Sequence, residues 1–75
     1  MSTRRLHNQN AISALMSNSV AHLLFSAYAK RHNLKAEDLV ITRVEEKELD
    51  FRTSFKIEFQ NEGMPGFVEF GYTIH

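Results

Sequence analysis

An alternation of apolar and polar residues between Phe51 and Gln60 is the clearest pattern along the chain. The residues on its apolar side are Phe51, Thr53, Phe55, Ile57 and Phe59, and those on its polar side are Arg52, Ser54, Lys56, Glu58 and Gln60. A period of two residues predicts a half-buried antiparallel strand, because successive side chains of a strand point to opposite faces. Such a strand needs an apolar cover on one face and leaves the other in water, so the pattern predicts a two-layer domain.

A second pattern, between Asn10 and His32, has the period of a helix. Its apolar residues recur every four positions or fill the gaps between those positions, and they are Ile12, Met16, Val20, Leu23, Leu24, Ala27 and Tyr28. This stripe predicts one helix from about residue 10 to residue 32. Asn10 is the expected N-cap and Asn33 the expected C′ residue, because asparagine accepts hydrogen bonds from free N–H groups and tolerates the left-handed conformation.

The segment Ser17-Asn18-Ser19 is the weak point of this helix, because it places three poor helix formers in a row. In an alternative arrangement the element is split there, and Ser19 caps a second helix. The continuous apolar stripe favours a single helix.

Three strands follow the helix. Leu39 to Val44 is rich in β-branched residues, Phe51 to Gln60 carries the alternation, and Phe67 to Ile74 places apolar side chains on one face. The charged segment Glu45–Asp50 is the expected first turn, and the Gly- and Pro-containing segment 61–66 is the expected second turn.

The order of these elements predicts an α+β fold, in which one N-terminal helix packs on a three-stranded antiparallel meander. Residues 10–75 are expected to form this single α-β-β-β domain. Residues 1–9 have Leu6 as their only sizeable apolar side chain after Met1, so they are expected to form a flexible basic arm.

One helix of about 33 Å matches strands of about 30 Å in length, so it can lie across the whole sheet. The helix residues expected in the core are Ile12, Met16, Val20, Leu23, Leu24, Ala27 and Tyr28. The sheet residues expected to face them are Ile41, Phe55, Ile57, Phe59, Val68, Phe70 and Tyr72.

A flank of the helix outside this stripe is the predicted protein interface. Its residues follow a heptad-like spacing of small side chains with an aromatic anchor, and they are Ala14, Asn18, Ala21, Phe25 and Tyr28. This spacing is typical of a helix that packs against another helix, which here belongs to a second copy or to another protein. The simpler alternative is that Phe25 shields the end of the core. Unpaired edge strands offer a second route to association.

The size and composition of the chain favour self-association. A domain of 75 residues buries only a small core, and the absence of cysteine excludes disulfides and thiolate metal sites. Nine Lys and Arg residues balance nine Asp and Glu residues, so the molecule as a whole has no strong attraction to nucleic acid or anionic membranes. The chain shows no signal peptide and no stretch of about 20 apolar residues, so a cytoplasmic location and no membrane partner are expected.

The residue types that carry chemistry do not form a recognisable reaction centre. The four histidines, His7, His22, His32 and His75, lack the spacing of metal ligands. The carboxylates between Glu45 and Asp50 fall in an expected solvated turn, which does not favour acid–base catalysis. The glycines do not stand between a strand and a helix, as a phosphate-binding loop requires. No enzyme activity, cofactor or metal is predicted.

The function expected from the sequence is therefore that of a small, non-catalytic protein-binding module. It is expected to act as a homodimer and as a regulator or inhibitor, of the kind that phages and mobile elements encode. The alternative is a nucleic-acid-binding protein, whose phosphate contacts are expected at Arg4, Arg5, Lys30, Arg31 and Lys35.

Overall fold

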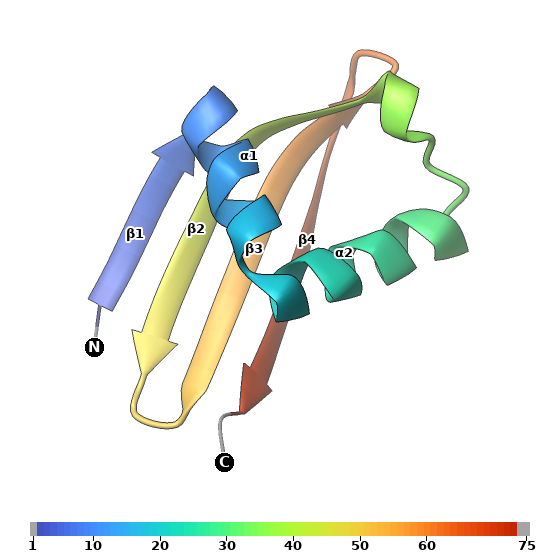
Figure 1. Ribbon diagram of the computed structural model, residues 1–75. Coiled ribbons are helices and arrows are strands. Elements are labelled where there is room, and N and C mark those ends of the chain that lie inside the picture. Colours follow the sequence, from blue (N-terminus) through green and yellow to red (C-terminus); the bar gives the residue numbers. More distant parts are fainter. Residues whose placement is uncertain (1, 74–75) are drawn as a thin grey trace.

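The computed structural model describes residues 2–73 and has the α+β architecture that the sequence predicts. The elements are β1 (Ser2–His7), α1 (Asn8–Ser17), α2 (Ser19–Arg31), the 3₁₀ turn η1 (Ala36–Asp38), β2 (Leu39–Leu49), β3 (Arg52–Asn61) and β4 (Met64–Thr73). Ile74, at the end of the third expected strand, and His75 lie outside the described residues. Figure 1 shows the helices over one face of the sheet, with α2 extending past β4.

Within the described residues the sheet has four antiparallel strands in the order β1-β2-β3-β4, one more than predicted. The extra strand is β1, so the predicted flexible arm is wrong for residues 2–7. Arg4 lies opposite Glu46 and Arg5 opposite Glu45, and each arginine forms an ion pair with the glutamate opposite it. A polar segment therefore forms an edge strand, because its partner strand supplies complementary charges.

The helical layer consists of two helices, so the single continuous helix is wrong as well. Asn18 adopts extended backbone angles between them, and its side chain accepts a hydrogen bond of 3.0 Å from the backbone N–H of Ala21. This is the geometry of an N-cap, and the cap is Asn18, whereas the split alternative placed it at Ser19. The Asn18 side chain also donates to the Tyr72 hydroxyl at 3.1 Å. Asn18 thus both starts α2 and ties it to β4.

The C-terminal end of α2 agrees with the prediction. Asn33 has a positive φ of 56°, and its N–H donates to the carbonyl of Lys30. The N–H of Leu34 donates to the carbonyl of Ala29 at 2.8 Å. These two bonds form a Schellman motif with Asn33 at the left-handed C′ position.

The strand β3 confirms the predicted alternation from Thr53 onward, whereas Phe51, expected on the buried side, lies in the turn and is 73% exposed. Thr53, Phe55, Ile57 and Phe59 are buried, and the residues between them are half-buried. In β2 the pairing shifts at Thr42, which is the extra residue of a β-bulge and donates to the Glu58 carbonyl at 3.1 Å. Because of this bulge, Ile41 and Val44 contribute to the core although they are three positions apart.

The first hairpin turn is shorter than predicted. β2 continues to Leu49, which pairs with Arg52, so the turn contains only Asp50 and Phe51. The charged residues from Glu45 to Glu48 therefore belong to a strand. The second turn is Glu62-Gly63, within the predicted segment, and both residues have positive φ values of 54° and 81°, as a two-residue turn of type I′ requires.

The helical face that packs on the sheet is not the predicted one. Among the described residues the buried apolar core is formed by Ala11, Leu15, Ala21, Phe25, Val44, Phe55, Ile57 and Phe59. Met16, Val20, Leu23 and Leu24 were expected in this core and are exposed to solvent. The helices have apolar residues on more than one side, and the bend at Asn18 turns Ala21 and Phe25 inward.

Candidate protein-binding surface

The predicted interface on the helix flank is not available, because most of it lies in the core of the same chain. Phe25 is 5% exposed and Ala21 is fully buried. The Phe25 ring packs against Tyr28 and edge-on against Phe59, with ring centroids 6.4 and 6.0 Å apart. Ala14 and Asn18 are half-buried beside the bend. These residues hold α2 on the sheet and leave little surface for a partner.

The outer side of α2 carries the apolar surface that the flank does not provide. Its exposed residues are Val20, Leu23, Leu24 and Ala27, which we call the α2 stripe. Spacings of three and four residues place them on one side of the helix, facing away from Phe25. Leu23, near the middle of the stripe, is 69% exposed, so most of this apolar side chain is in contact with solvent.

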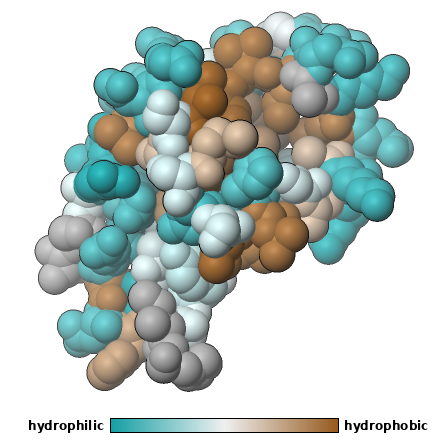
Figure 2. All heavy atoms as spheres, viewed as in Figure 1, coloured by the Kyte–Doolittle hydropathy of each residue, from teal (hydrophilic) through white to brown (hydrophobic). Residues whose placement is uncertain are grey.

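A groove lies on another side of α2, and its volume is about 700 Å³. Its floor includes Leu15, Phe25 and Ala29, and its walls are formed by α1, by α2 and by the start of β2. Figure 2 shows apolar side chains in two areas of this face, one between α1 and η1 and the other over the first half of α2. The helix α2 therefore borders two apolar surfaces, one on each of two sides.

The five cations expected to contact nucleic acid do not form one surface. Arg4 and Arg5 lie on β1, where they pair with Glu46 and Glu45, whereas Lys30 and Arg31 end α2. Figure 1 shows β1 and the end of α2 on opposite sides of the molecule. Lys35 lies between α2 and η1. Because two of the five cations are already paired and the rest are distant from them, the structure gives no continuous track for a phosphate backbone.

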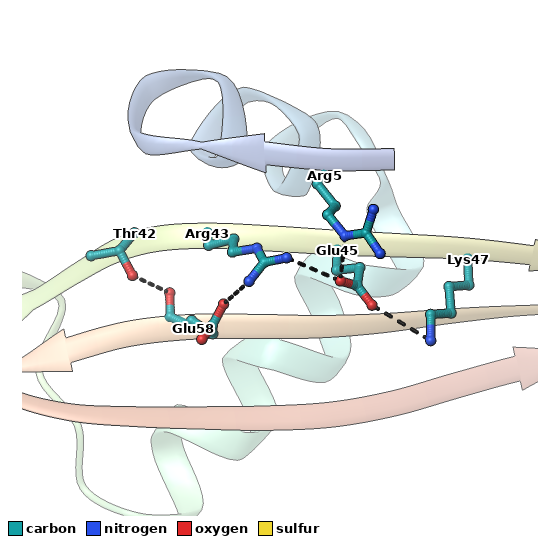
Figure 3. Close-up of polar contacts among 6 residues, drawn as sticks. All are labelled: Arg5, Thr42, Arg43, Glu45, Lys47 and Glu58. Atoms are coloured by element: carbon teal, nitrogen blue, oxygen red, sulfur yellow. Dashed lines mark hydrogen bonds and ion pairs between the residues drawn. The ribbon is translucent and has the colours of Figure 1, made fainter. Parts of the chain in front are cut away.

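The outer face of the sheet carries a network of ion pairs. Figure 3 shows three cations around the Glu45 carboxylate, which lies 3.0 Å from Arg5 Nε, 3.2 Å from Arg43 Nη2 and 3.5 Å from Lys47 Nζ. Arg43 also pairs with Glu58 at 3.3 Å. The hydrogen bond from Arg5 is the main reason why the pKa of Glu45 is lowered, and the charge of Lys47 lowers it further. Each carboxylate of the network has a cationic partner, which is the arrangement of a structural face.

The described residues contain neither a metal site nor a membrane-spanning helix. In residues 2–73 there is no group of three or more His, Cys, Asp or Glu side chains that could hold a metal ion. No helix in this part of the chain has the length and apolar character that crossing a bilayer requires.

The groove and the α2 stripe were not found from the sequence, although a signal for them was present. The helical segment has more apolar residues than one face can hold, and it contains no carboxylate, because the first one in the chain is Glu37, beyond the helices. An apolar segment without a single acidic residue is unusual for a solvated helix surface, which normally carries charges of both signs. This composition distinguishes the helical layer from an ordinary charged helix surface.

Comparisons with protein-family models, with curated proteins and with solved structures find no match to this chain. The function is therefore inferred from the geometry of the chain itself.

Proposed function

We propose that the chain is a non-catalytic protein-binding module of the regulator or inhibitor type, which works in the cytoplasm as a homodimer. The observation that carries this proposal is the exposed α2 stripe, an apolar helix face on a domain with a small core. Scattered single apolar residues are common on protein surfaces, but a row at helical spacing is the pattern of a helix–helix contact.

The charges of α2 favour an antiparallel arrangement of the two copies. Lys30 and Arg31 both lie in the last turn of α2, and the helix has no acidic residue that would neutralise them. In a parallel pair these cations would lie side by side. In an antiparallel pair centred between Leu23 and Leu24 they are separated by about 20 Å, at 1.5 Å per residue, and Val20 faces the small Ala27 of the other copy.

Leu23→Glu is the variant that tests the dimer. It places a charge at the centre of the proposed contact, and it changes neither the core nor the helix propensity by much. We expect the wild type to sediment as a dimer at micromolar concentration and Leu23→Glu to sediment as a monomer with an unchanged circular dichroism spectrum.

Met64→Glu is the matched control, because Met64 is 71% exposed and Leu23 is 69% exposed. Met64 lies at the start of β4, and Figure 1 shows this end of the strand at the top of the sheet, above α2. Met64→Glu is expected to remain a dimer. A wild type that is monomeric at every concentration, or a Leu23→Glu variant that still dimerises, would contradict the proposal.

A further inference from the structure

The groove remains open when the α2 stripe is covered. At 100° per residue, Ser26 lies about 100° from Phe25 on the groove side of α2, whereas the mean direction of the α2 stripe lies about 150° from Phe25 on the opposite side, with Leu23 at the edge nearer the groove. Ser26 lines the groove, whereas none of the four residues of the α2 stripe does. Two copies that meet through their stripes would therefore leave both grooves accessible.

The two sides of the groove differ in chemistry. The α2 side presents His22, Ser26 and Lys30, which are spaced four residues apart and form a row along the helix. The opposite side is apolar and includes Met16 and Val40, which are 61% and 57% exposed. Each of the three polar residues can donate a hydrogen bond, and none of the described residues that line the groove is a carboxylate.

We propose that the groove binds an amphipathic α-helix of a partner protein, with carboxylates along one edge of its apolar face. This inference rests on the proposed protein-binding function and names the chemistry of the target. The row from His22 to Lys30 extends over about 12 Å, or two helical turns. Glu or Asp residues seven or eight positions apart on the bound helix reach both ends of this row, while the apolar side chains between them fill the groove.

The groove is better suited to such a helix than to a second copy of the chain or to a bilayer surface. A second copy has no carboxylate on α1 or α2 to place opposite Lys30, because the chain has no Asp or Glu before Glu37. A bilayer surface is broad and contacts projecting side chains, whereas the floor at Leu15 and Ala29 lies inside a concave site. A protein helix supplies both the convex apolar shape and the row of acceptors.

Two fluorescein-labelled peptides test this proposal by anisotropy titration with the full-length protein. Both form amphipathic helices with Leu at positions i, i+3, i+4 and i+7; one carries Glu along one edge of this face, and the other carries Gln at the same positions. We expect the Glu peptide to bind roughly 3- to 10-fold more tightly, because one exposed charge contact with Lys30 and a hydrogen bond from His22 contribute modestly. This difference should shrink as salt is raised.

Variants of the protein locate the contact. Lys30→Glu is expected to remove the preference for the Glu peptide, whereas Arg31→Glu, with the same charge change on the stripe side of α2, should retain it. Val40→Glu is expected to weaken the binding of both peptides at least 10-fold, because it places a charge in the apolar wall. Circular dichroism and thermal melting establish that each variant folds.

The outcomes separate this proposal from the dimer. Leu23→Glu is expected to be a monomer that still binds the Glu peptide. A wild-type dimer that binds neither peptide up to 1 mM, or binds both equally, overturns the groove proposal and leaves the dimer standing. Binding to anionic phosphatidylserine vesicles through Val40 and Lys30, without binding to the Glu peptide, also overturns it. Peptide binding by a wild-type monomer overturns the dimer alone.

Discussion

The strand β3 and the helix α2 are both rich in apolar residues, but they bury them differently. In β3 every apolar residue of the alternation between Thr53 and Phe59 faces the helices. In α2 the buried residues are Ala21 and Phe25, while other apolar side chains such as Leu23 point into solvent. The strand therefore has one apolar face, and the helix has more than one.

This difference shows why one element was predicted correctly and the other was not. A strand has only two faces, so an alternating sequence leaves no choice about which one is buried. A helix with apolar residues around most of its circumference can pack on several faces, and the tertiary contacts decide among them. The choice in α2 follows from the bend, which brings Phe25 onto Phe59. The surplus apolar face is then left exposed to solvent.

The largest expected effect is the loss of a core side chain from either element. Ile57→Ala in β3 should lower the free energy of unfolding by about 2–5 kcal/mol and Phe25→Ala in α2 by about 3–5 kcal/mol, because each leaves a cavity. Leu23→Ala, measured at a protein concentration where the dimer dissociates, should change it by less than about 0.5 kcal/mol. Urea denaturation measures all three. A larger loss of unfolding free energy for Leu23→Ala than for Phe25→Ala would show that the buried and exposed faces of α2 are assigned the wrong way round.

A smaller effect is expected at the bend that selects the inner face. Asn18→Ala removes the N-cap of α2 and the hydrogen bond to Tyr72, and it should cost about 1–2 kcal/mol of unfolding free energy. Asn18→Asp retains the acceptor for the Ala21 N–H but loses the donor to Tyr72, so it should cost less. Thermal or urea unfolding of both variants and of Tyr72→Phe separates the two bonds. Equal stability of Asn18→Ala and wild type would show that neither bond fixes the bend.

The smallest effect concerns the outer face of the sheet, and it depends on pH. The pKa of Glu45 is lowered from its ordinary value of 4.5 in the folded protein. A carboxyl group with a depressed folded pKa stabilises the fold above its unfolded pKa, and this contribution is lost as the pH falls through the folded value. Glu45→Gln should therefore lower the melting temperature at pH 7, and the difference from wild type should shrink at pH 3. A melting-temperature difference between Glu45→Gln and wild type that is the same at pH 3 and pH 7 would show that the protonation of Glu45 is not coupled to folding.

The sequence was sufficient where local geometry decides the structure. The alternation in β3, the C′ position of Asn33 and the turn around Gly63 each depend on a few neighbouring residues. The strand β1 was missed because its polar residues become favourable only opposite Glu45 and Glu46, which are about 40 positions away. The opposite charges of Arg4-Arg5 and Glu45-Glu46 were visible in the sequence, but their register was not.

The candidate site was harder to predict than the fold, because it consists of the apolar side chains that are not buried in the core. Assigning Val20 and Leu23 to the core placed the interface on Ala21 and Phe25, so the two faces of α2 were exchanged. The groove depends on the angle between α1 and α2 and on the position of Val40, neither of which follows from periodicity. Only the absence of carboxylates before Glu37 pointed to an unusual surface there.

The hydrogen bond between Asn18 and Tyr72 has a consequence for the motions of the molecule. It joins the bend between the helices to β4, which lies at the edge of the sheet that the described residues form. An opening of the helical layer that carries Asn18 away from the sheet would break this bond or move the end of β4 with it. For such an opening, we expect faster hydrogen exchange of the amides at the end of β4.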